Sequence, residues 1–317
     1  MARAPMRDLS DVVFLRREAI ADGYTDRAIR ALVKAGVWQR VRHGAYVSGA
    51  LWAELEVADR HRVRARAVLR TAHPSTVLSH VSAAVEHGAP VWGVDLEVVH
   101  VTRTDGKPRR REAGVVHHTG VLPDDDLVPV NGVRATTPLR VAAEMTTVAS
   151  VESALVSVDA LLRLAGADGG EVAARLAVVN RWPYSLASQV VFRLADPRHE
   201  SPGESRTAYF CWQMHLPKPE PQVEIRDEAG DLVARLDFAW AAFGVFLEFD
   251  GKEKYLRFRR DGETLDEFLM REKEREELVC KLTGWTCIRI RWAELHRPEV
   301  LARLIRAILD SRRTAAS

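Results

Sequence analysis

The first clear pattern along the chain is a set of apolar positions at helical spacing near the N-terminus. Leu32 and Val33 follow Ile29 by three and four residues, in a segment that begins after a threonine and ends at Gly36. With the segments before it, this pattern predicts three short helices between residues 9 and 36. The next stretch, "VWQRVRHGAYVSG", has two short β-rich runs on either side of "RHG", which is typical of a tight hairpin.

Basic residues of this segment fall on the face opposite to the apolar positions. Arg27, Arg30 and Lys34 follow one another at i, i+3 and i+7, and the hairpin adds Arg40 and Arg42. Helix, turn, helix and basic hairpin, in this order, predict a winged helix-turn-helix, which places its second helix in the major groove of DNA. A solvated helix face gives the same stripe of charge, so the DNA interpretation depends on the stripe, the turn and the hairpin occurring together.

The stretch from about residue 55 to residue 180 carries no chemical signature of its own. Helical segments alternate there with strand-like "LEVVHVT" and "GVVHHTG", which predicts an α+β middle domain. Histidines gather in it at positions 73, 80, 87, 117 and 118. No cysteine lies near them and neither H-x-x-E-H nor H-E-x-x-H occurs, so ordinary polar or core histidines are favoured over metal ligands.

From Ser201 onward, helical and alternating patterns follow one another clearly. "SPGESRTAYFCWQMH" begins as a helix with Ser201 as N-cap and Glu204 at its third position. "PQVEIRD", "LVARLDFAW" and "VFLEFD" predict three successive strands, a charged helix covers about residues 262–282, and "GWTCIRIRW" predicts a fourth strand. The expected order is α-β-β-β-α-β.

Strand alternation brings acidic residues together in this C-terminal part. Glu248 and Asp250 share one face of their strand, and a short turn brings Asp237 alongside Glu248 on an adjacent antiparallel strand. Like charges side by side destabilise a sheet, so these carboxylates favour a bound cation, with Mg²⁺ as the preferred hard ion. Lys252 or Lys254 can then help to orient or deprotonate an attacking water.

Each of these residues also has a purely structural interpretation. Glu248 and Asp250 can be the charged end of a hairpin, or a strand edge that discourages edge-to-edge pairing. Glu204 stands where a capping box places glutamate, so helix capping weighs as much as catalysis. Lys252 and Lys254, taken alone, are typical surface lysines.

The overall composition limits the number of domains, the kind of partner and the cellular compartment, but does not indicate a specific function. With 317 residues, 47% of them hydrophobic, the chain is long enough for several domains, which we expect at 1–52, 53–181 and 182–317. The net charge is only +2, but residues 1–70 hold fourteen Lys and Arg against eight Asp and Glu, a local +6 that favours a polyanion partner. Three cysteines without a CxxC pair, no long apolar stretch and no secretion signal predict a cytoplasmic protein without a membrane partner.

The N-terminal pattern is similar to a known family of regulators. "IRALVKAGVWQRVRHGAYV" resembles the N-terminal domain of AbiEi-type antitoxins, the transcriptional regulators of type IV toxin–antitoxin systems. "SHVSAA", "VHVT" and "GVRATTPLRVAAEM" resemble the region that follows this domain in AbiEi-like proteins. The resemblance implies DNA as a partner, and a toxin or another product of the same operon as a second one.

The C-terminal blocks resemble a second family. "ESPGES", "RLDFAW", "VFLEFDGKEKY" and "GWTCIRIRW" are similar to very short patch repair endonuclease-like domains of the PD-(D/E)xK superfamily, and imply a restriction-endonuclease-like fold. The resemblance makes Asp237 and Glu248 metal ligands, Glu204 a supporting acid, and Lys252 or Lys254 the basic partner. The superfamily pattern has lysine where this chain has Asp250. Either a nearby lysine substitutes, or Asp250 is a third metal ligand, or the site is inactive.

Two functional hypotheses follow. The leading one is an α/β multidomain DNA-binding protein whose C-terminal domain is a Mg²⁺-dependent endonuclease. The second is a non-catalytic transcriptional regulator or antitoxin, in which the C-terminal domain acts as a clamp or as the platform of a homodimer.

Overall fold

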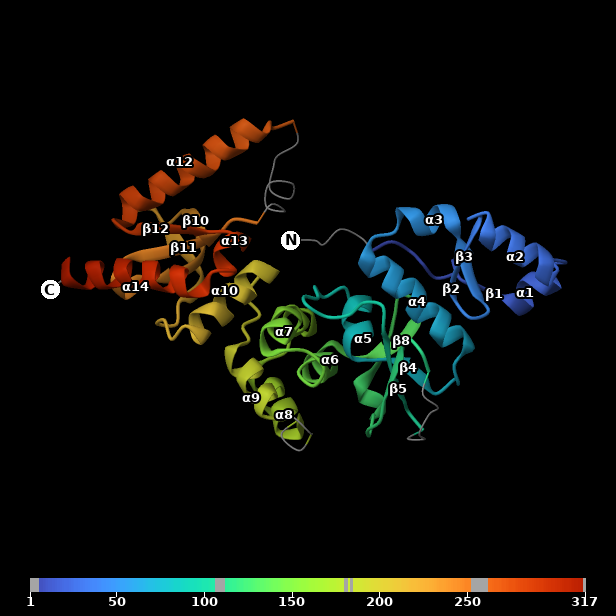
Figure 1. Ribbon diagram of the computed structural model, residues 1–317. Coiled ribbons are helices and arrows are strands. Elements are labelled where there is room, and N and C mark those ends of the chain that lie inside the picture. The colour runs from blue at the N-terminus through green and yellow to red at the C-terminus, as the bar shows by residue number, and fades with distance from the viewer. Residues whose placement is uncertain (1–5, 106–111, 180–181, 183–184, 252–261, 316–317) are drawn as a thin grey trace. The chain divides into compact units, whose positions relative to one another are not determined.

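The computed structural model describes residues 6–105, 112–179, 182, 185–251 and 262–315 (Figure 1). Over these ranges the protein is a mixed α/β structure with three sheets and helices packed on them. The chain divides into two compact units, residues 1–192 and 193–317. The finer division into three domains stays a prediction.

The first unit begins with a three-stranded sheet of order β1-β3-β2, formed by β1 (Phe14–Leu15), β3 (Ala45–Ser48) and β2 (Trp38–Arg42). Strands β2 and β3 are the expected antiparallel hairpin. Helices α1 (Arg16–Ala21) and α2 (Asp26–Lys34) lie between β1 and β2, and the Thr25 side chain caps α2 by accepting a hydrogen bond from the Ala28 amide at 3.2 Å. The expectation of three helices is wrong, because Phe14 and Leu15 pair with Tyr46 and Ala45 as a strand instead.

Two helices connect this sheet to the rest of the unit: α3 (Gly49–Glu54) and α4 (Val57–Thr71). Val63 and Ala67 of α4 are completely buried against Leu9 and Val13, so the helix shares a core with the N-terminal sheet. On another face of α4, Arg66 donates hydrogen bonds to the buried Glu86 at 2.7 and 3.0 Å. The helix therefore belongs to both neighbouring parts of the unit.

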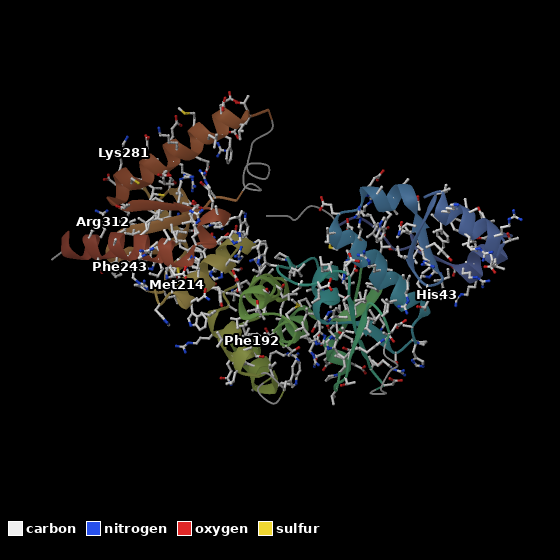
Figure 2. The ribbon with its side chains drawn as sticks, viewed as in Figure 1. His43, Phe192, Met214, Phe243, Lys281 and Arg312 are labelled. Atoms are coloured by element: carbon white, nitrogen blue, oxygen red, sulfur yellow. The ribbon has the colours of Figure 1, made fainter. Side chains whose placement is uncertain are left out.

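A five-stranded mixed sheet of order β6-β5-β4-β8-β7 forms the centre of the first unit. Its strands are β4 (Thr76–Leu78), β5 (Val99–Arg103), β6 (Val115–His118), β7 (Leu127–Val130) and β8 (Val133–Thr136). The same unit contains the helices α5 (His80–Glu86), α6 (Pro138–Met145), α7 (Val151–Ala165), α8 (Gly169–Val179) and α9 (Ser185–Leu194). The unit ends at Phe192, within α9 (Figure 2).

The second unit has the predicted order of elements. Helix α10 (Pro202–Gln213) precedes β9 (Glu220–Arg226), β10 (Leu232–Trp240) and β11 (Val245–Phe249), and α12 (Leu265–Thr283) leads to β12 (Thr286–Ile290). The sheet order is β12-β11-β10-β9, with β11 and β12 parallel and the other pairs antiparallel. The chain then forms α13 (Trp292–Leu295) and α14 (Pro298–Ala315).

Both faces of this second sheet are covered by helices (Figure 1). Leu247 and Phe249 point into a core with α10 and α14, where Met214 and Phe243 also pack (Figure 2). Phe246 points to the other face and packs with Val279 of α12. Full burial of side chains of this size contributes about 1.5–3 kcal/mol each. Glu248, which follows Phe246 by two positions, consequently lies on the face that α12 covers.

None of the helices in the described ranges is both long enough and apolar enough to cross a membrane.

Candidate functional site

The structure brings two of the predicted acids together on the central strands of the second sheet. Phe238 is opposite Leu247, so the next position toward the start of β10 brings Asp237 beside Glu248. The amide of Phe249 donates a hydrogen bond to Asp237 Oδ2 at 2.8 Å. Both acids are buried, with exposed fractions of 7% for Asp237 and 4% for Glu248. Two carboxylates in this position need positive charge nearby.

An arginine from α12 supplies part of that charge. Arg275 Nη2 lies 3.6 Å from Glu248 Oε2 and donates a hydrogen bond to Glu272 Oε2 at 3.0 Å. Burial by itself lowers the pKa of Arg275, but the charges of Glu248, Glu272 and Asp237 outweigh it, and the pKa is raised. Arg275 is therefore a permanent cation beside both acids. The sequence pattern did not predict it, because Arg275 lies far along the chain from both acids, in a separate helix.

Ser201 caps α10 as predicted, and the Glu204 carboxylate contacts the residues of this cap. The Ser201 hydroxyl donates to Glu204 Oε1 at 2.7 Å, and the Glu204 amide donates to Ser201 Oγ at 3.2 Å. Its other oxygen, Oε2, accepts hydrogen bonds from the Glu200 amide at 3.0 Å and from Gln222 Nε2 at 2.7 Å. Glu204 thus joins the start of α10 to β9, the strand next to the one that carries Asp237.

Gln222 is a second residue that the sequence analysis missed. Its φ of +56° lies in the left-handed region, which a residue other than glycine adopts at a cost in free energy. Its neighbours Pro221 and Val223 pair with Phe238 and Leu236, so Gln222 lies across from Asp237. No sequence signal marks such a conformation.

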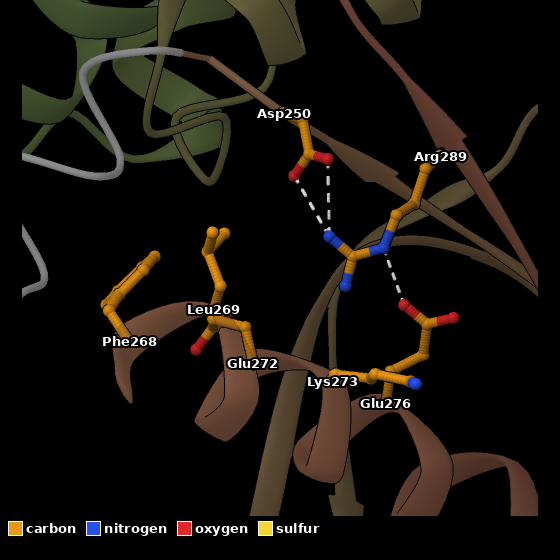
Figure 3. Close-up of a pocket in the computed structure, with 7 residues that line it drawn as sticks. All are labelled: Asp250, Phe268, Leu269, Glu272, Lys273, Glu276 and Arg289. Carbon is orange, nitrogen blue, oxygen red and sulfur yellow. Dashed lines mark hydrogen bonds and ion pairs between the residues drawn. The ribbon is translucent and has the colours of Figure 1, made fainter. Parts of the chain in front are cut away.

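Asp250 lies beside this group but has its own partner. Arg289 Nη1 is 3.1 and 3.2 Å from the two oxygens of Asp250, and Arg289 Nε donates to Glu276 Oε2 at 2.5 Å (Figure 3). These three residues line a pocket of about 130 Å³, which holds a few water molecules but is far smaller than the 300–1,000 Å³ of typical small-molecule sites. The other lining residues are Phe268, Leu269, Glu272 and Lys273.

Lys252 and Lys254, the predicted basic partners, lie outside the described residues.

The charge balance around Arg275 fits a divalent cation. Among the described residues, Glu248, Glu272 and Asp237 raise its pKa, and their three negative charges exceed the one positive charge of Arg275 by two. The neighbouring ion pair of Arg271 with Glu263, at 2.8 Å, adds no net charge. Within the described ranges no set of three or more His, Cys, Asp or Glu side chains is arranged to hold a metal. However, Mg²⁺ is commonly held by only one or two carboxylates together with substrate phosphates, so a Mg²⁺ site at Asp237 and Glu248 stays a prediction.

The predicted DNA-contacting residues lie mostly on an open surface of the first unit. Arg27, Arg30 and Lys34 of α2 are exposed, as is Arg40 of β2. The helix has a strong division between an apolar side, with Ile29 buried, and this charged side. His43, in the turn of the hairpin, is also exposed (Figure 2).

Arg42 differs from the other predicted contacts, because it forms an ion pair with Glu112 and is only partly exposed. Its charge is therefore partly neutralised within the first unit.

Three histidines form a cluster beside the five-stranded sheet: His80 at the start of α5 is buried, while His100 of β5 and His118 of β6 are partly buried. The rings of His80 and His118 are stacked, with centroids 3.4 Å apart and an angle of 13° between the planes. His100 Nδ1 lies 3.0 Å from His118 Nε2, so one ring donates a hydrogen bond to the other. The parallel pairing of β5 with β6 creates this contact. It sets Thr102 opposite His118, and His100 lies two positions before Thr102 on the same face of the sheet, so His100 is diagonally across from His118. The sequence indicated a concentration of histidines but not His100 or the stacking.

No protein-family model and no curated protein matches this chain.

Proposed function

We propose that this chain is a DNA-binding protein whose C-terminal unit hydrolyses phosphodiester bonds of DNA with the help of Mg²⁺. The observation that carries the proposal is the pair of buried carboxylates, Asp237 and Glu248, side by side on β10 and β11. The order of elements around them, α-β-β-β-α-β, is the one expected for a restriction-endonuclease-like domain, and it supports the same proposal.

The residues have separate tasks in this proposal. Asp237 and Glu248 would hold Mg²⁺, which supplies stabilisation of the negative charge that develops on the phosphate. The Phe249 amide fixes the orientation of Asp237 through its 2.8 Å hydrogen bond. Glu204 and Gln222 connect α10 to β9 and thereby support the strand that faces Asp237.

Recognition of DNA belongs to the first unit in this proposal. We propose a winged helix-turn-helix there, with α2 in the major groove and the β2–β3 hairpin on the backbone. The exposed row of Arg27, Arg30 and Lys34 supports this arrangement, because phosphate contacts by basic side chains supply most of the affinity for DNA.

The test is cleavage of supercoiled plasmid by the purified full-length chain with Mg²⁺. We expect Asp237→Asn and Glu248→Gln each to lower the nicking rate by about 10²-fold or more, because the metal stabilises the transition state by several kcal/mol. Glu224→Gln is the matched control, since Glu224 is an exposed acid on the neighbouring β9. Cutting at the normal rate by folded Asp237→Asn and Glu248→Gln proteins would contradict the site.

A second function, that of a non-catalytic regulator, is favoured by one specific observation. Asp250 stands in the position where the nuclease pattern has lysine, and it is paired with Arg289. A regulator predicts protection of a specific operator in a footprint of the protein's own promoter. It also predicts that no strand breaks appear when Mg²⁺ is added.

A further inference from the structure

We propose that Arg275 of α12 is the cationic catalytic residue of this site and contacts the phosphate that is cleaved. The inference rests on the proposed function. It places on a helix residue the positive charge that the resemblance assigned to Lys252 or Lys254, but not their role in deprotonating water.

The position of α12 makes this assignment possible. The helix covers the sheet face that carries Phe246 and Glu248, and its residue Val279 packs against Phe246. Arg275 lies one helical turn before Val279, which directs its side chain toward the same face. Its Nη2 consequently reaches to 3.6 Å from Glu248 Oε2.

The hydrogen bonding of Arg275 leaves room for another acceptor. Nη2 donates to Glu272 at 3.0 Å, while the 3.6 Å approach to Glu248 is an ion pair rather than a hydrogen bond. Nε is buried and has no hydrogen-bond partner in the part of the chain that the structure describes. A buried donor without an acceptor is unfavourable, so the guanidinium has unused hydrogen-bonding capacity beside Glu248.

Arg289 is another arginine beside a predicted acid of this unit, and it is a weaker candidate. It lies between two carboxylates, at 3.1 Å from Asp250 and 2.5 Å from Glu276. Its Nε and Nη1 atoms both donate to these carboxylates, whereas Nε of Arg275 has no hydrogen-bond partner within the described residues. In contrast, Arg275 lies beside the two acids that the proposed chemistry requires.

A guanidinium at this position has a defined chemical role. Its several N–H donors and planar shape allow it to hold a carboxylate and a phosphate oxygen at the same time. Donors placed where negative charge develops stabilise the transition state of phosphoryl transfer. Arg275 keeps its proton throughout, so it stabilises charge and does not deprotonate the attacking water.

The experiment compares Arg275→Met, Arg275→Lys and the control Lys281→Met in the full-length chain. Lys281 is an exposed lysine near the end of the same helix, so its loss removes one positive charge from α12 away from the acids (Figure 2). Two quantities are measured for each protein: kcat for nicking of plasmid with Mg²⁺, and the dissociation constant of Mg²⁺ alone by calorimetry. Circular dichroism and melting temperature report folding.

We expect Arg275→Met to lower kcat by about 10²-fold, the usual effect of removing one donor from a developing negative charge. Its Mg²⁺ dissociation constant should be equal to or lower than that of the wild type, because a competing cation has been removed from the carboxylates. Arg275→Lys should recover part of kcat, and Lys281→Met should match the wild type in both measurements.

The outcomes separate this inference from the proposed function. A wild type that cuts, together with a folded Arg275→Met protein that cuts equally fast, overturns the role of Arg275 and leaves the nuclease proposal standing. Weaker Mg²⁺ binding and a lower melting temperature in both Arg275 variants overturn it too, because they indicate a structural ion pair. A wild type that neither binds Mg²⁺ nor nicks DNA overturns the proposed function and this inference with it.

Discussion

Gln222 has a strained backbone conformation that its contacts with neighbouring residues stabilise. A left-handed φ costs on the order of 1–3 kcal/mol for a residue other than glycine. In return, the Gln222 amide donates a 2.7 Å hydrogen bond to Glu204, whose carboxylate is only 2% exposed. A hydrogen bond to a buried charge contributes about 1.5–3 kcal/mol, enough to offset the strain. The conformation is therefore a consequence of tertiary contacts, which is why the sequence does not indicate it.

The histidine cluster leads to a prediction about how the free energy of unfolding depends on pH. Burial lowers the pKa of His100 to about 4 and the pKa of His118 to about 3, helped by neighbouring histidines. In the unfolded chain each pKa is about 6.5, so below that pH the unfolded state binds more protons than the folded state. The free energy of unfolding should thus be greatest above about pH 6.5 and fall as the pH is lowered toward 4.

Urea denaturation at pH values from 7 to 4.5 measures this dependence. We expect the double variant His100→Asn/His118→Asn to be less pH-dependent than the wild type, by as much as about 1.4 kcal/mol per pH unit for each histidine. The control is His73→Asn, at an exposed position, which should keep the wild-type slope. An unchanged slope in the double variant would show that these two rings do not cause the acid sensitivity.

At the scale of elements, the strands that carry the two acids could be predicted from the sequence, but the position of α12 on the sheet could not. Alternation in "VFLEFD" and the short turn after β10 suffice to bring Asp237 beside Glu248, because both depend on residues close in sequence. Arg275 reaches Glu248 from a helix whose position on the sheet depends on long-range packing, such as Val279 against Phe246. Local sequence patterns contain no information about where this helix packs, and so none about the distance between Arg275 and Glu248.

Helix α2 is the element whose role is easiest to test by DNA binding. Arg27, Arg30 and Lys34 are exposed, and none of them has an ion pair in the described part of the chain. We expect replacement of each one by alanine to weaken binding and to reduce the slope of log affinity against log salt concentration by about one, because one phosphate contact is lost. Fluorescence anisotropy on a duplex at several salt concentrations gives the slope.

Arg303→Ala is the matched control for α2. Arg303 is an exposed arginine on α14 of the second unit, so its loss changes the net charge by the same amount. A reduction in slope from Arg303→Ala as large as that from the α2 variants would assign the effect to overall charge rather than to a DNA-contacting helix.

At the scale of the whole molecule, buried ion pairs join the parts of the first unit that lie before and after position 52. Glu86 is completely buried and is held by Arg62 and Arg66 of α4, while the guanidinium of Arg62 also donates to the Arg7 carbonyl at 3.0 Å. Removing one partner of such a network typically costs about 3–5 kcal/mol. Residues before and after position 52, which the sequence pattern separates into two domains, are therefore joined through α4.

This joining gives a prediction about fragments of the chain. A fragment of residues 1–52 lacks Val63 and Ala67, which are completely buried against Leu9 and Val13, so its small apolar core is incomplete. We expect this fragment to show no cooperative thermal transition by circular dichroism, whereas fragments 1–192 and 193–317 each melt cooperatively. The second fragment should keep the affinity of the full chain for Mg²⁺ and lose most of its affinity for DNA. A cooperative transition in fragment 1–52, with the DNA affinity of fragment 1–192, would contradict the dependence on α4 and would make residues 1–52 a separate domain.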